Sequence, residues 1–197
     1  MPPPTGKPSN YLNRIRFPIR GRRVALVRPD REHLGEVVPL LTDRKIWRWT
    51  LHIPYPYTER HGREWVHRSA RRWAAGSDVG LLVVRRSDGR VLGGVGLHHL
   101  EEGGASGEVG YWIGRPYRGA GYASEAVRLM LRLGFDQLKL HRIEARIFPG
   151  NRDSVRLVRR LGFSYEGRLR HEVKKAGKWR DSLLYSRLAT DRARRSS

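Results

Sequence analysis

Residues 107–126 read Gly-Glu-Val-Gly-Tyr-Trp-Ile-Gly-Arg-Pro-Tyr-Arg-Gly-Ala-Gly-Tyr-Ala-Ser-Glu-Ala, and this stretch decides the fold. Its first half is typical of a strand and its second half opens a helix. The small-residue turn between them leaves the first backbone N–H groups of the helix without partners. Together with the positive end of the helix dipole, these groups form a site for a phosphate or diphosphate. Gly119 and Gly121 let an anion approach the backbone, and the guanidinium of Arg118 would add charged hydrogen-bond donors.

Three other interpretations of this turn are weaker or fail. A plain glycine-rich helix start remains open, because many proteins have one. A dinucleotide-binding fingerprint fails because position 124 is Ser rather than a third Gly. A P-loop fails because no Gly-Lys-Ser/Thr follows the turn.

Alternating strand and helix signals extend outward from the turn. Apolar residues from Ala123 to Gly134 recur with helical spacing and predict one buried stripe. Ser87-Asp88-Gly89 joins two apolar runs and predicts a hairpin. Asn151 is placed to cap a helix that ends at Gly162. Further strands are expected at 22–27, 141–148, 163–170 and 182–188, and further helices from Asp30 to Leu41 and from His61 to Ala75. This order predicts an α/β (α+β) domain, a single sheet with helices on both faces.

The composition bounds the class of protein. A chain of 197 residues fits one domain with a proper core, and no apolar run is long enough for a bilayer span. We expect a loose basic arm at 1–20, a domain at 21–190 and a basic tail at 191–197. The chain has no cysteine and opens with Met-Pro-Pro-Pro rather than an apolar leader, so we expect a cytoplasmic protein.

The net charge is +21, and residues 139–180 alone carry 13 Lys and Arg against 4 Asp and Glu. Such a surface attracts polyanions, among them RNA, the ribosome and phosphorylated cofactors. A merely arginine-rich, solvated surface explains the composition equally well, and both interpretations stay open at this point.

A family resemblance rests on two halves of one pattern. Arg118-x-x-Gly121-x-Ala123 resembles the cofactor signature of the GNAT acetyltransferases. Asn151-x-x-Ser154, followed by Leu161-Gly-Phe163 and Glu166-Gly167, looks like the second half of that pattern. The ending Gly177-x-x-x-Asp181-x-x-x-Tyr185 resembles the branch that acetylates ribosomal-protein N-termini (RimJ/RimL-like). The resemblance spans roughly residues 22–188 and is specific from Glu108 onward.

The resemblance implies a mixed, mostly antiparallel sheet of about six to seven strands that splays between two central strands. It also implies acetyl-CoA as cosubstrate, with no metal. The diphosphate would lie on the turn and the pantetheine arm beside the preceding strand. The implied cofactor-binding residues are Tyr111, Trp112, Ile113, Arg118, Gly119, Ala120, Gly121, Tyr122, Ala123 and Asn151.

Two residues are candidates for the catalytic chemistry. Glu108 lies on the strand leading into the site, where a carboxylate could take the proton of the acceptor ammonium. An exposed carboxylate paired with an arginine is the structural alternative. Ser154 could meet the leaving thiolate, because Val158 stands where many GNAT enzymes carry a tyrosine as general acid. A water molecule or direct release of the thiolate would serve as well.

The resemblance places the acceptor groove at an aromatic-rich stretch. Trp47, Trp49 and Tyr55 are the substrate-binding candidates, although core or wall packing is the more common role for such residues. His98 and His99 adjoin acidic residues, but neighbours in a strand point to opposite faces, which argues against a metal site.

The expected reaction is acetylation of a primary amine, first of all a protein N-terminal α-amine such as that of a ribosomal protein. A small-molecule amine such as an antibiotic, a polyamine or an amino-acid derivative is the alternative within the class. A protein that only senses acetyl-CoA, or only binds RNA or the ribosome, is the alternative outside it. No membrane partner is expected, and the protein would be a monomer or a homodimer.

Overall fold

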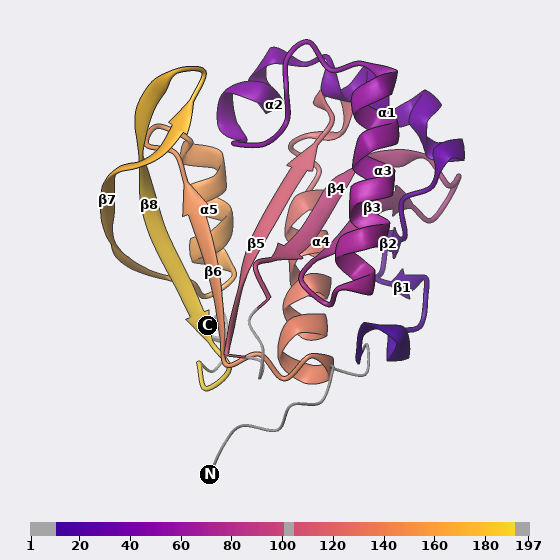
Figure 1. The fold of residues 1–197 in the computed structure, drawn as a ribbon. Coiled ribbons are helices and arrows are strands. Elements are labelled where there is room, and N and C mark those ends of the chain that lie inside the picture. The colour runs from indigo at the N-terminus through magenta and orange to yellow at the C-terminus, as the bar shows by residue number, and fades with distance from the viewer. Residues whose placement is uncertain (1–10, 101–104, 192–197) are drawn as a thin grey trace.

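Eight strands in the order β1-β2-β3-β4-β5-β6-β8-β7 form one sheet in the computed structural model, which describes residues 11–100 and 105–191 (Figure 1). Neighbouring strands are antiparallel, except that β5 and β6 are parallel. The strands are β1 (Ile19–Arg20), β2 (Val24–Val27), β3 (Val79–Arg85), β4 (Val91–His98), β5 (Ser106–Ile113), β6 (Arg142–Ile147), β7 (Ser164–Lys175) and β8 (Lys178–Leu188). The predicted mixed, mostly antiparallel sheet is confirmed, and β1 raises the number of strands above the expected six to seven.

Most helices begin at a side-chain cap that the sequence supplies. The helices are α1 (Leu34–Leu41), α2 (Arg44–Trp49), α3 (Glu59–Ala74), α4 (Tyr122–Arg132) and α5 (Arg152–Arg160). Asp43 caps α2, Thr58 caps α3 in a reciprocal capping box with His61, and Asn151 caps α5. The predicted helices are present, but α2 was not expected because its short aromatic segment lacks helical periodicity.

The helices cover the two faces of the sheet unequally. α1 and α3 lie on one face, and α4 and α5 lie behind the sheet in Figure 1. The larger core forms between the sheet and α4, where Val127 and Met130 are fully buried. A smaller core gathers Val37, Leu41 and Ile46 of α1 and α2 against β3 and β4. No described helix combines the length and apolar character that crossing a membrane requires.

The N-terminal segment differs from the expected loose arm where the structure describes it. Leu12 is fully buried in a 3-10 turn, η1 (Tyr11–Arg14), and Ile15 is also in the core. The Phe17 ring packs 5.5 Å from the ring of Trp73, measured between centroids. The apolar residues of this Arg-rich segment therefore dock it against α3, and residues 1–10 and 192–197 lie outside the described residues.

Candidate active site

The sheet divides at β5 and β6, as predicted. These parallel strands pair only from Ser106–Arg142 to Glu108–Glu144. Beyond that point β5 continues with β4 and β6 with β8, so the facing backbone edges of the two strands no longer pair with each other. A cavity of about 920 Å³ opens at this divergence and is lined by both strands.

Glycines make room for the cavity on the face of the sheet that α3 covers. Gly80, Gly96 and Gly110 lie side by side on β3, β4 and β5. A Cβ atom on Gly96 would stand 2.7 Å from the His98 ring and 2.9 Å from a backbone oxygen, so no larger residue fits there. The sequence interpretation missed this floor, because only strand register shows that the three glycines are neighbours.

The turn between β5 and α4 has the geometry of an anion site. Gly119 and Gly121 have φ angles of 80° and 81°, in the left-handed region that favours glycine. Helix α4 begins after Gly121 with no side-chain cap, and its first helical hydrogen bond comes from the Glu125 amide. The preceding amides of Ala120, Tyr122 and Ala123 therefore have no backbone or side-chain acceptor within the described residues. Such amides at a positive helix end bind phosphate.

Arg118 has a structural role in this turn in addition to the role predicted for it in cofactor binding. Its Nε donates to the Ile113 carbonyl at 2.9 Å, and its Nη2 donates to Asp43 Oδ2 at 2.6 Å. Burial alone would raise the pKa of Asp43, but hydrogen bonds from the Lys45 amide and from Arg118 outweigh burial and lower it. Arg118 therefore fastens the turn to the start of α2, a contact between residues 75 positions apart that no local pattern predicts.

A second carboxylate fastens the turn to β2. Glu125 accepts hydrogen bonds from the Arg23 amide at 2.7 Å and from Arg23 Nε at 3.2 Å. Burial opposes its ionisation, but these bonds and one from the Val24 amide lower the pKa of Glu125. The anion site is thus held from both sides by ion pairs.

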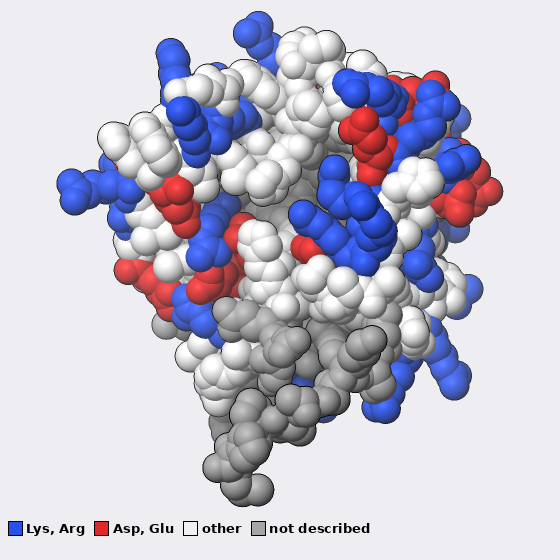
Figure 2. Space-filling view, viewed as in Figure 1, with Lys and Arg blue, Asp and Glu red and all other residues white. Residues whose placement is uncertain are grey.

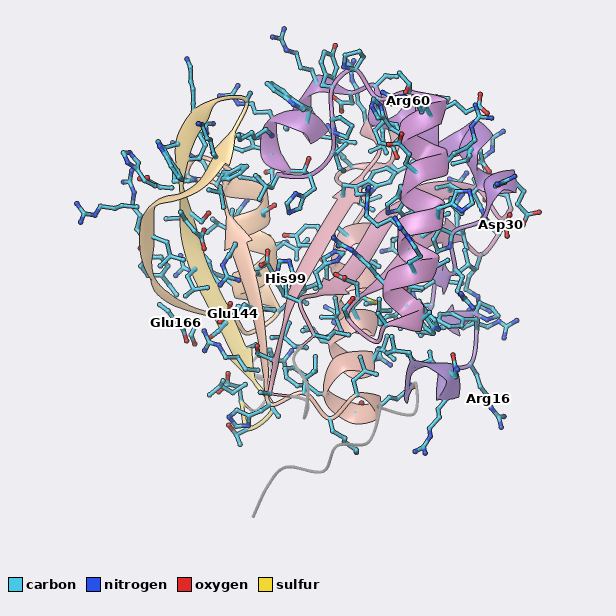
Figure 3. The ribbon with its side chains drawn as sticks, in the orientation of Figure 1. Arg16, Asp30, Arg60, His99, Glu144 and Glu166 are labelled. Atoms are coloured by element: carbon cyan, nitrogen blue, oxygen red, sulfur yellow. The ribbon has the colours of Figure 1, made fainter. Side chains whose placement is uncertain are left out.

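Three carboxylates from three strands meet on one guanidinium at the divergence. Arg146 of β6 bonds Glu108 of β5, Glu144 of β6 and Glu172 of β7, each at 2.8 Å. One oxygen of Glu172 is buried without a hydrogen-bond partner in the described residues. Arg142 extends the network from Glu144 to Glu166, and Figure 3 labels both glutamates on this side of the sheet. Only Glu108 was a candidate from the sequence, because Glu172 follows no local signal.

Tyr111 and Ser154 meet on the other face of the divergence. The Tyr111 hydroxyl is buried and makes no hydrogen bond of good geometry with the described residues. Burial raises the pKa of Tyr111 to about 12, and polar contact with Ser154 offsets part of that rise. The Ser154 amide donates to Asn151 Oδ1 at 3.3 Å, which confirms Asn151 as the cap of α5. All three residues line the cavity.

Comparison with known proteins decides the family. The model of the acetyltransferase (GNAT) domain matches residues 23–164. This chain belongs to the GNAT acetyltransferase family. It is 37% identical to "Uncharacterized N-acetyltransferase p20" of Bacillus licheniformis over 57% of this chain and 62% of that protein. It is 30% identical to "Putative ribosomal N-acetyltransferase YdaF" of Bacillus subtilis over 84% of this chain and 90% of that protein.

A solved structure extends the likeness to three dimensions. Mycobacterium smegmatis RimJ, in complex with CoA-disulfide, superimposes with a TM-score of 0.76 at 25% identity. That match covers 84% of this chain and 82% of RimJ. Coverage of p20, by contrast, is below two thirds of that relative's length.

The three aromatic residues predicted to bind the acceptor in the GNAT domain differ in their position relative to the cavity. Trp49 lines the cavity, whereas Trp47 and Tyr55 pack against each other at 5.9 Å between centroids and do not line it. The Lys175 ammonium lies over the Trp47 ring at 4.7 Å and donates to the Trp47 and Thr50 carbonyls. These contacts dock the hairpin of β7 and β8 onto the end of α2, so Trp47 belongs to the frame of the cavity.

The two histidines at the end of β4 in the GNAT domain do not point apart as expected. His99 leaves the strand with a φ of 52°, and both rings line the cavity. His98 Nδ1 lies 2.9 Å from Asp78 Oδ1, and His99 Nδ1 lies 3.9 Å from Glu108. No group of three or more metal-ligating side chains occurs in residues 11–100 and 105–191.

Proposed function

We propose that this protein transfers the acetyl group of acetyl-CoA to a primary amine, and that this amine is the N-terminal α-amine of a protein such as a ribosomal protein. One observation carries the proposal. A single cavity reaches the open backbone edge of β5, the hydroxyls of Tyr111 and Ser154, and the carboxylates around Arg146. The name of YdaF, a putative ribosomal N-acetyltransferase, supports the class of acceptor.

The residues present fit acetyl-CoA. The amides of the Gly119–Ala123 turn suit its diphosphate, and the space that a Cβ atom would take at Gly119 is open. The backbone edge of β5 from Val109 to Ile113, which β6 leaves unpaired, suits the amides of a pantetheine arm added like a strand. The RimJ structure with CoA-disulfide supports this assignment. Acetyl-CoA, when bound, supplies the reactive thioester.

Glu108 would remove the proton of the acceptor amine. An amine attacks only in its neutral form, so a base must accept the ammonium proton directly or through water. Glu108 Oε2 is held by Arg146, and Oε1 has no partner within the described residues. Arg146 therefore fixes the carboxylate while one oxygen stays open to the cavity.

Ser154 and Tyr111 would supply the proton for the leaving thiolate. Val158, at the position where the family resemblance leads us to expect a tyrosine, is fully buried in the core. The buried Tyr111 hydroxyl lies beside Ser154 and has no other polar partner among the described residues. A phenol whose pKa is about 12 remains protonated at neutral pH and can donate.

Mass spectrometry tests the proposal. Purified protein and isotopically labelled acetyl-CoA are added to a ribosome-containing lysate, and the labelled products are identified. A labelled protein N-terminus supports the proposal in full. Label found only on small molecules would indicate that the acceptor is a small-molecule amine. Binding of acetyl-CoA by calorimetry with no labelled product would indicate a sensor without catalysis.

A further inference from the structure

We propose that the acceptor carries an anionic group, a carboxylate, in addition to the amine that is acetylated. This inference rests on the proposed function and concerns the other end of the same cavity. Its basis is that two opposite walls of the cavity carry opposite charges (Figure 2).

The acidic wall lies at β5, β6 and β7. Glu108, Glu144 and Glu172 line it and all three bond Arg146, while Arg142 bonds Glu144 and Glu166. Four carboxylates against two guanidinium groups leave a net negative charge at the point where the strands diverge. An ammonium group is attracted to this wall before its proton is removed.

The basic wall lies on α3, across the hollow in Figure 2. Arg68 and Arg72 line it from one face of the helix, one turn apart. Arg72 pairs with the buried Asp78 at 3.4 Å, whereas the Arg68 guanidinium has no partner within the described residues. An arginine left unpaired at a cavity wall is available for an anionic group of a ligand.

The electrostatics of a neighbouring histidine indicate the same polarity. The protein partly desolvates His52, and the charges of His98, His99 and Arg72 add to that effect. Burial is the largest cause that lowers the pKa of His52, and Arg72 and Arg68 of the basic wall add smaller contributions in the same direction.

The two walls together select the substrate. A polyamine would place a second positive charge against Arg68, which is unfavourable. An amine with no other charge would leave Arg68 unpaired. An amine that also carries a carboxylate satisfies both walls, with the amine at the glutamates and the carboxylate at the guanidinium. Two sources have this chemistry: a peptide whose second residue is acidic, and a free amino acid.

Matched acceptors test the inference. One pair is a C-terminally amidated peptide beginning Ser-Asp and its Ser-Asn counterpart. The other is aspartate and its diamide. We measure kcat/KM for each with the wild type, with Arg68→Gln, and with the control Arg71→Gln, which replaces an exposed arginine of α3 that does not line the cavity.

The expected result is a preference of about tenfold or more for the carboxylate member of at least one pair, since a charged hydrogen bond is lost with the amide. Arg68→Gln should abolish this preference and Arg71→Gln should keep it. The pair that shows the preference identifies the source. Equal rates within both pairs, or equal losses in both variants, would overturn the inference. No turnover with any amine would instead contradict the proposed function.

Discussion

The Arg146 guanidinium donates a hydrogen bond of 2.8 Å to Glu108 across the point where β5 and β6 stop pairing. This bond joins the two arms of the divergence just where their backbone hydrogen bonds end. It also fixes a carboxylate at the cavity, so the same contact serves the fold and the proposed chemistry.

Replacing Glu108 by Gln should lower turnover about a hundredfold or more, because the amide cannot accept the amine proton. Arg146 keeps Glu144 and Glu172 as partners, so the fold should survive. Acetyl-CoA affinity, measured by calorimetry, should stay nearly the same. Glu32→Gln, on the exposed surface, is the control. Unchanged rates for Glu108→Gln across pH would assign Glu108 a structural role.

Gly121→Val should abolish acetyl-CoA binding, because a branched side chain would fill the anion site and is strained at a φ of 81°. The matched control is Gly89→Val in the β3–β4 hairpin, at a φ of 73° with open space around it. Both variants should lose stability in thermal melts because both positions have a positive φ, and only Gly121→Val should lose the melting-temperature increase that acetyl-CoA causes. Retained binding by a folded Gly121→Val protein would place the diphosphate elsewhere.

Tyr111→Phe should lower the activity of the enzyme without lowering its stability. Removing a buried hydroxyl without a good partner should leave the free energy of unfolding unchanged or raise it by about 1 kcal/mol. Turnover should nevertheless fall about tenfold to a hundredfold if the hydroxyl donates a proton. The double variant with Ser154→Ala should lose less than the sum of the two single losses in activation free energy, because the two hydroxyls act together. A fully active Tyr111→Phe enzyme would leave proton donation to Ser154 or water.

Lys175 should make stability depend on pH. Burial, with help from the charge of Arg180, lowers the pKa of Lys175 from 10.5 to about 8. Between these values the unfolded chain holds the proton more tightly than the folded one, so the free energy of unfolding should rise as pH increases from about 8 to 10.5. Denaturant unfolding of the wild type and of Lys175→Met should show this rise only in the wild type. Parallel pH profiles would show that Lys175 titrates normally.

Charge reversal at exposed basic residues tests whether the protein associates with the ribosome. Many arginines of 139–180 are engaged in ion pairs, and Lys175 is docked on α2, but Arg170, Lys174 and Lys178 are exposed. Reversing these three charges should flatten the plot of log affinity against log salt for ribosomes, which counterion release makes linear. Reversing Arg60, Arg63 and Arg71 on α3 is the control. Equal effects from both sets would favour a generally arginine-rich surface over a dedicated patch.

The sequence by itself determined the parts of this protein that depend on local order. Helix α4 follows from a stripe with helical spacing, the hairpin from Ser87-Asp88-Gly89, and the anion turn from Gly119 and Gly121, because each of these signals lies within a few residues. The spacing of Asn151 and Ser154 likewise gave the start of α5 and, through its resemblance, the family.

Only the tertiary structure decided which charges meet. Glu172 reaches Arg146 from a strand 26 residues away in the chain, and Arg118 reaches Asp43 from 75 residues away. Periodicity shows which face of an element is buried, but ion pairs depend on strand order and on where two strands part. The spacing of polar side chains on an exposed face does not indicate which residues they pair with. The glutamates around Arg146 and the unpaired Arg68 therefore became visible only when the chain was folded.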